Sequence, residues 1–250
     1  MSEDLWQTYA MEVGQHRQWP IGDAVFHVRR EPDEWQVARQ PTDDDGEPPW
    51  KRWPADASWS DVVLAPAMPD RPVVARPESP VQLAPGCEAR FFVSIPLWVR
   101  FTVAGVEPAL ALLDAPAVVL SSIWFGEPTE GELCYSLKTR ARRCDTQDSA
   151  ENPHRAVCPV RMINETEAAV EFQRVCLQGK HLNIYRGATH LWTDAVDVAW
   201  PRGQAVTARV KVAGRPTEAE QDAEPLAKAR VAPPTGHFWQ KGMGMVKTWI

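Results

Sequence analysis

The chain has 250 residues, which suits one large β domain or two smaller ones with a real hydrophobic core. Its formal net charge of -6 argues against attraction of the whole molecule to nucleic acid. No apolar run approaches the ~18 residues that a membrane-spanning helix needs. We therefore expect no nucleic-acid partner and no direct membrane insertion.

The composition favours short strands joined by turns. The chain holds 12 tryptophans and 23 prolines but only 14 glycines. Proline disfavours helix interiors and central strands, and tryptophan suits half-buried sheet surfaces. These counts predict a mainly β protein of antiparallel β-sandwich architecture, with two packed sandwich-like halves and little helix.

Residues 1–60 are expected to form an N-terminal region that packs on the body of the protein. A short helix is predicted within residues 1–15. The runs AVFHVRR and EWQVARQ, at residues 24–30 and 34–40, predict a β-hairpin. Residues 41–60 indicate a surface loop that packs back through its three tryptophans, Trp50, Trp53 and Trp59.

A first β half is predicted over residues 61–150. Its clearest pattern is an apolar residue at every second position from Ala89 to Val103, which places these side chains on one face of a strand. The opposite face includes Glu88, Arg90 and Phe92. Pro96 cannot donate a ladder hydrogen bond and predicts a bulge, an edge or a break.

A second β half is predicted over residues 151–213, where apolar, strand-like runs follow a polar loop at 144–157. Residues 214–235 are polar and rich in proline, which predicts a linker or a short exposed helix. The last residues become apolar again. Residues 214–250 are therefore expected to be a linker followed by a docked tail.

The segment Ser121–Arg143, SSIWFGEPTEGELCYSLKTRARR, carries the densest chemistry. Glycine and proline predict a turn that feeds a strand from Glu132. In that strand Leu133, Tyr135 and Leu137 would be buried, and three cations would line the other face about 6.5 Å apart, at Lys138, Arg140 and Arg142. The alternative is a helix, since Leu133 and Leu137 are four positions apart.

This segment supports several interpretations. A non-enzymatic binding or interaction module comes first, with an anion or partner site at Trp124, Glu127, Glu130, Glu132, Lys138, Arg140 and Arg142. Alternatively, the same charges form an internal salt-bridge network. An enzyme for a small anionic or sugar-like substrate could use Glu127, Glu130 or Glu132 as acid or base. Local nucleic-acid binding through 138–143 is a further alternative. No catalytic residue is assigned.

The cysteines and histidines predict neither a metal site nor a cofactor. There are five cysteines, the closest two, Cys134 and Cys144, lie ten positions apart, and no C-x-x-C occurs. They are expected to be free thiols in a cytoplasmic protein, since the N-terminus does not have the pattern of a secretion signal. His181 and His190 could meet across a hairpin.

Two stretches together resemble a known family. IWFGEPTEGELCYSLKTRARR and the preceding RFFVSIPLWVRFTV are similar to the uncharacterised prokaryotic family named domain of unknown function 432, most firmly over about residues 78–180. The family has no established activity, so the resemblance implies no catalytic residues. Its genes are sometimes found near genes for mechanosensitive channels, which implies a membrane-associated protein partner.

Overall fold

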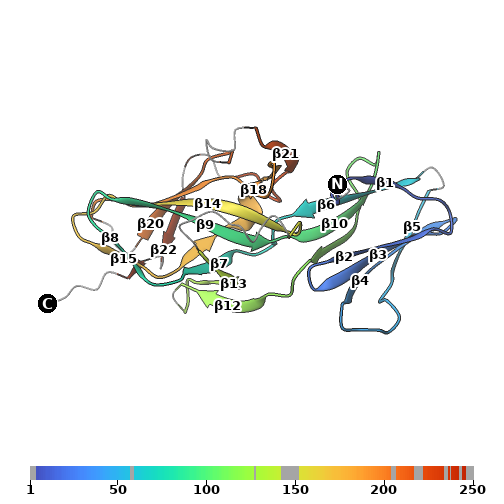
Figure 1. Ribbon diagram of the computed structural model, residues 1–250, viewed down its shortest axis with the longest axis horizontal. Helices are drawn as coiled ribbons and strands as arrows, with labels where there is room; N and C mark the ends of the chain where they lie inside the picture. The colour runs from blue at the N-terminus through green and yellow to red at the C-terminus, as the bar shows by residue number, and fades with distance from the viewer. Residues whose placement is uncertain are drawn as a thin grey trace. The chain divides into compact units, whose positions relative to one another are not determined.

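The computed structural model describes residues 4–56, 59–126, 128–141, 152–203, 207–216, 222–233, 236, 238–241 and 244–245 (Figure 1). Strands dominate this part of the chain, beside the single 3-10 turn η1 (Gly179–His181), which confirms the mainly β prediction. None of the described residues belongs to a helix with the length and apolar character that crossing a membrane requires. The chain forms two compact units, drawn from interleaved segments.

Unit 1 takes its residues from Met1–Ala67, Pro96–Val119 and Asn152–His154. Its described residues form two antiparallel sheets of four strands. The first sheet has the order β1 (Thr8–Ala10), β6 (Asp61–Ala67), β10 (Trp98–Val103) and β11 (Ala111–Pro116). The second has the order β2 (His16–Ile21), β3 (Ala24–Arg30), β4 (Glu34–Pro41) and β5 (Lys51–Pro54).

Two predictions for the N-terminal region have opposite outcomes. The β3–β4 hairpin is confirmed, with Ala24 opposite Pro41 and Arg30 opposite Trp35. The short helix within residues 1–15 is wrong, because Thr8–Ala10 is strand β1. Its pairing with β6, where Thr8 lies opposite Val63, supplies backbone hydrogen bonds from a distant segment that local sequence cannot reveal.

The two sheets of unit 1 pack on each other as a sandwich. The ring of Phe101 on β10 lies 5.6 Å from Trp19 on β2 and 6.4 Å from Phe26 on β3, between ring centroids. Phe26 and Phe101 are fully buried. Aromatic pairs at these separations add to the free energy gained by burying their area, so Phe101 anchors this core.

A pair of histidines on the second sheet receives the tryptophan-rich loop. Nε2 of His16 and Nδ1 of His27 are 3.2 Å apart, and the Trp50 ring packs edge-on against both imidazoles. This confirms for Trp50 that the loop packs back. The Arg29 guanidinium stacks over the Trp50 ring at 4.8 Å. Burial is the main cause that lowers the pKa of His16, and the charge of Arg29 lowers it further. Burial is also the main cause that lowers the pKa of His27, and His16 lowers it further.

We expect this pair to make stability depend on pH. Because folding lowers both histidine pKa values below the ordinary 6.5, the unfolded chain binds more protons in that range. The contribution of the two neutral histidines to the free energy of unfolding is complete above pH 6.5. It is lost as the pH falls from 6.5 towards the pKa values of the folded state. Denaturant titrations from pH 8 to about 5 should show this fall. The variant His27→Gln should show a flatter profile, and an unchanged slope would contradict the assignment.

Unit 2 takes its residues from Met68–Ile95, Leu120–Glu151 and Arg155–Ile250. One sheet has the order β12 (Ser121–Phe125), β13 (Glu132–Ala141), β7 (Val73–Pro77) and β16 (Val175–Leu177). A smaller sheet has the order β23 (Gly244–Met245), β15 (Val170–Phe172) and β8 (Val81–Leu83).

The largest sheet of unit 2 has eight strands among the described residues. Its order is β21 (Glu224–Ala227), β17 (Ile184–Arg186), β18 (Leu191–Thr193), β14 (Arg155–Asn164), β19 (Val196–Trp200), β20 (Thr207–Val212) and β22 (Phe238–Lys241), with β9 (Glu88–Pro96) also paired to β14. Strand β21 lies where a linker or helix is predicted. The pairs β13–β7, β14–β18 and β14–β19 are parallel, so these sheets are mixed rather than purely antiparallel.

The alternating run from Ala89 to Val103 is confirmed as strand, and it is divided at the proline. Strand β9 ends at Pro96, and β10 starts at Trp98. Phe91 and Val99 are among its buried apolar residues. Because Pro96 lacks an N–H, the ladder breaks there and the chain passes from unit 2 to unit 1.

A buried carboxylate organises one end of the large sheet. Asp194 is fully buried. It accepts hydrogen bonds from the backbone N–H of Asn183 at 2.7 Å, from Nδ2 of Asn183 at 2.9 Å and from the Tyr185 hydroxyl at 2.7 Å. Burial, followed by this hydrogen bond to Asp194, raises the pKa of Tyr185. The Asn183 side chain in turn accepts the N–H of Ala229 at 2.9 Å, which ties the chain after β21 to the network.

Candidate functional site

In the described part of Ser121–Arg143 the predicted turn and strand are present, and the helical alternative is wrong. Strands β12 and β13 pair in antiparallel fashion, with Trp124 opposite Leu133 and Phe125 opposite Glu132. Gly126 has φ of 106°, and a Cβ atom there would lie 2.9 Å from the Cα of Gly131. The turn therefore requires glycine at position 126 for both conformation and space.

The predicted buried face of β13 is wrong at its beginning. Leu133 is 44% exposed and Tyr135 is half-buried, whereas Cys134, predicted for the opposite face, is fully buried. Leu137 is buried as predicted. The cause is that one face of the sheet is covered at the start of β13 and open at its end. Cys134 lies on the face that carries the buried Val74 and Cys176, whereas further along the same face carries the exposed Arg76 and Arg140.

The predicted site residues lie in different environments. Trp124 is 48% exposed, and Glu130, Lys138 and Arg140 are exposed. Glu132 is half-buried and accepts a 2.6 Å hydrogen bond from Nε2 of Gln178. The two other predicted members, Glu127 and Arg142, lie outside the described residues. Within the described part of the chain, neither Lys138 nor Arg140 pairs with a carboxylate.

A pocket of about 300 Å³ lies elsewhere in unit 2. Strands β9, β14 and β19 and the segment after β20 supply its lining, which includes Arg90, Phe92, Arg161, Asp197, Arg215 and Pro216. None of the five predicted site residues that the structure describes lines this pocket. Among the lining residues that the structure describes, three guanidinium groups face one carboxylate, which gives this lining a positive balance.

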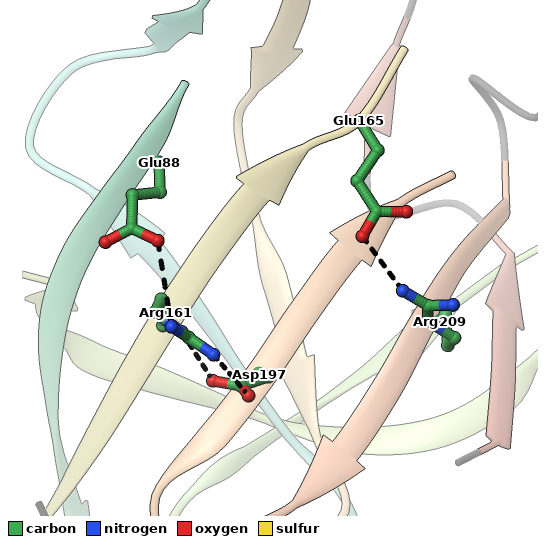
Figure 2. A network of polar contacts seen from close by, with 5 residues as sticks. All are labelled: Glu88, Arg161, Glu165, Asp197 and Arg209. Carbon is green, nitrogen blue, oxygen red and sulfur yellow. Dashed lines mark hydrogen bonds and ion pairs between the residues drawn. The ribbon is translucent and has the colours of Figure 1, made fainter. Parts of the chain in front are cut away.

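One of the three arginines is held by a network across the sheet (Figure 2). Arg161 donates from Nε to Oδ1 of Asp197 at 2.9 Å and from a terminal nitrogen to Oδ2 at 2.8 Å. Glu88 lies 3.7 Å from the same guanidinium. Asp197 also raises the pKa of Arg161, chiefly by hydrogen bonding. A bidentate pair fixes the plane of the guanidinium, so Arg161 is oriented before any ligand arrives.

The other two arginines differ from Arg161. Arg90 and Arg215 are exposed, and no carboxylate among the described residues pairs with either. Arg215 is anchored through its backbone, since its carbonyl accepts the N–H of Ala195 at 2.8 Å. Figure 2 shows a second ion pair on the same sheet, between Arg209 and Glu165 at 2.9 Å. Among the charged lining residues that the structure describes, Arg161 and Asp197 therefore neutralise each other, whereas Arg90 and Arg215 have no carboxylate partner.

Sequence reasoning places Arg90 and Phe92 on the outward face of their strand but does not identify the pocket. The lining residues come from four separate stretches of chain, and no short motif joins them. The available signal is the outward Glu88–Arg90–Phe92 pattern, which is typical of a half-exposed strand face. Only the sheet order, with β9 and β19 on either side of β14, brings the arginines together.

A second group of reactive side chains gathers below β13. Sγ of Cys134 lies 3.8 Å from Sγ of Cys176, and Sγ of Cys176 lies 3.9 Å from Oε1 of Glu132. Both cysteines are fully buried. The hydrogen bond between the two thiols is the main cause that lowers the pKa of Cys134. Among the described residues, Glu132, Cys134 and Cys176 form the group whose ligand atoms lie close enough together to bind one metal ion. Neither His181 nor His190 belongs to such a group among these residues.

The fold and these sites define a mainly β protein of two compact units, with a cationic pocket in the second. The model of the family described as protein of unknown function DUF432 matches residues 5–246, so the chain belongs to that family. This confirms the resemblance and extends it to nearly the whole chain. No curated protein and no solved structure matches the chain.

Proposed function

We propose that the protein is a binding module whose second unit captures a small anionic ligand. The observation that carries this proposal is the presence of Arg90 and Arg215 at one pocket, without a carboxylate partner in the described part of the chain. Like charges gathered on a protein surface repel each other, and an anion between them relieves that repulsion. Arg161 adds a third, already oriented guanidinium.

The lining favours a carboxylate or phosphate group attached to a small apolar body. A guanidinium matches both groups with two parallel hydrogen bonds. Phe92 is half-buried and, with Pro216, offers an apolar wall. The volume of about 300 Å³ lies at the small end of the range for ligand pockets, so the ligand would be small.

Binding should be visible as ligand-dependent stabilisation. We expect inorganic phosphate, citrate or a small aryl phosphate to raise the unfolding temperature of the wild-type protein, because a ligand that binds only the folded state stabilises it. The double variant Arg90→Ala/Arg215→Ala should lose the shift, with affinity weakened roughly tenfold or more. Thermal unfolding across a ligand series, checked by calorimetry, measures this.

The matched control removes two other exposed cations, in Lys138→Ala/Arg140→Ala. This variant should keep the full ligand-dependent shift. If it loses the shift while Arg90→Ala/Arg215→Ala retains it, the anion site lies on β13 and the pocket assignment is wrong. Both arginines of the pocket are exposed, so their replacement should leave the unfolding temperature without ligand nearly unchanged.

A partner-binding surface on β12 and β13 is the second candidate. Trp124 and Leu133 lie opposite each other and are 48% and 44% exposed, with the cations Lys138 and Arg140 further along β13. Exposed aromatic and basic residues are enriched where proteins bind partners. The family resemblance suggests a membrane-associated protein for this role. The enzyme and nucleic-acid alternatives stay predictions. The cytoplasmic location also stays a prediction, and it agrees with Cys87, Cys134, Cys158 and Cys176 being outside any disulfide.

A further inference from the structure

Three side chains of unit 2 meet on the sheet in which β13 and β16 lie on either side of β7. Cys134 and Glu132 come from β13, and Cys176 comes from β16, 42 positions later. One sulfur or oxygen atom of each lies within 4.8 Å of the corresponding atoms of the other two. Strand β7 lies between β13 and β16 in the sheet, so the fold rather than a local motif brings the three together.

Two of the three separations are close to those around a tetrahedral zinc ion, and the third is within 4.8 Å. With Zn–S bonds of about 2.3 Å and tetrahedral angles, two thiolate ligands lie ~3.8 Å apart, and a thiolate and a carboxylate oxygen ~3.6 Å apart. The observed separations are 3.8 Å between the two sulfurs and 3.9 Å from Sγ of Cys176 to Oε1 of Glu132. Little movement is needed to place one ion among the three atoms.

The kind of ligands selects the kind of metal. Calcium and magnesium take oxygen ligands, so two sulfurs disfavour both. Two thiolates and one carboxylate suit zinc, which accepts S, N and O ligands, and three protein ligands leave a fourth position for water. Because Glu132 is half-buried while both cysteines are fully buried, that position would open on the side of the carboxylate.

The surroundings already orient the carboxylate. Nε2 of Gln178 donates a 2.6 Å hydrogen bond to Oε1 of Glu132. Hydrogen bonds of this kind to metal-ligating groups tune affinity. The guanidinium of Arg174 stacks 4.8 Å over the ring of Phe125, the residue opposite Glu132. Zinc with two thiolates and a carboxylate carries one negative charge, which a neighbouring cation helps to balance.

We propose that Cys134, Cys176 and Glu132 form a zinc-binding site in unit 2. On binding, both thiols lose their protons to solvent, two Zn–S bonds and one Zn–O bond form, and nothing is oxidised or reduced. The site is separate from the anion pocket, which none of its three residues lines. Its ligands belong to two different strands, so the bound ion would also join β13 to β16.

The test uses the full-length, reduced protein after chelation and removal of the chelator. Titration with Co²⁺ should produce the intense thiolate-to-metal absorption and the visible bands of a tetrahedral cobalt–sulfur site, with a stoichiometry of one. Zn²⁺ should then abolish these bands by displacement. Cys134→Ser and Cys176→Ser should each lose the thiolate absorption, and Gln178→Leu should weaken zinc binding by ~10–100-fold through the misoriented carboxylate.

Two other cysteines provide the controls. Cys158→Ser replaces a fully buried thiol outside the group, and Cys87→Ser replaces an exposed one. Both variants should bind cobalt and zinc like the wild type. Circular dichroism establishes that each variant is folded. Should a buried cysteine variant fail to fold, Glu132→Gln, at a half-buried position, keeps the test decisive because it should weaken zinc binding without removing a thiol.

Three results would overturn the proposal. The first is the absence of thiolate-to-cobalt absorption in the reduced wild type. The second is equal absorption in Cys134→Ser and the wild type. The third is a Cys134–Cys176 disulfide that forms on oxidation while the reduced protein binds no metal, which would make the two a redox pair. Arg90→Ala/Arg215→Ala should keep full zinc binding, so this proposal and the anion pocket can fail independently.

Discussion

Replacing Asp194 with alanine should lower the free energy of unfolding of the protein by about 3 kcal/mol or more. The change removes the acceptor of the half-buried backbone N–H and Nδ2 of Asn183, and it leaves the buried hydroxyl of Tyr185 with the carbonyl of Gly214 alone, at 3.0 Å. Each unsatisfied buried polar group costs about 1–3 kcal/mol. Urea unfolding followed by tryptophan fluorescence measures the loss.

The matched control is Asp197→Ala on the neighbouring strand β19. Its carboxylate also accepts two hydrogen bonds, but its side chain keeps 30% of its exposure, so water can replace it. We expect a loss of at most about 1 kcal/mol there. If Asp194→Ala and Asp197→Ala destabilise the protein equally, the burial of Asp194 and its hydrogen bonds does not add to the free energy of unfolding.

Replacing Phe101 with alanine should destabilise unit 1 by about 3–5 kcal/mol. The phenyl ring is fully buried, and it contacts Trp19 and Phe26 across the sandwich. Its removal leaves a cavity between two sheets whose strands cannot close around it without breaking their register. The shift in denaturant midpoint should be much smaller for Phe101→Leu, which fills most of the space.

An exposed position in the same unit supplies the comparison for Phe101. Val13 keeps 55% of its exposure, so Val13→Ala should change the free energy of unfolding by no more than about 0.5 kcal/mol. A small effect of Phe101→Ala, comparable with that of Val13→Ala, would mean that the sandwich core does not depend on this ring.

The sequence predicts the local features of the fold well. The alternation from Ala89 to Val103 identifies a strand and its inward face, and Pro96 marks its break. The hairpin of β3 and β4 follows from two runs around a turn. These features depend on side-chain periodicity and on proline chemistry, which are properties of adjacent residues.

What the sequence does not predict depends on distant segments. The inward face of β13 is misassigned at Leu133 because the distant strands β7 and β16 place the buried Val74 and Cys176 on the opposite face, beside Cys134. The helix predicted before residue 15 is replaced by a strand because β6 offers it a partner. The cysteine spacing in the sequence argues against a metal site. Cys134 and Cys176 nevertheless meet, because only one strand, β7, lies between their strands in the sheet.

The interleaved segments of the two units have a consequence for how the chain is made. Strand β6 ends at Ala67, but its partner β10 starts only at Trp98, after Met68–Ile95 of unit 2 has been translated. Unit 1 also needs Asn152–His154. A nascent chain therefore cannot finish its N-terminal unit before more than half of the protein has left the ribosome. For the same reason, no single cut of the gene yields either unit whole.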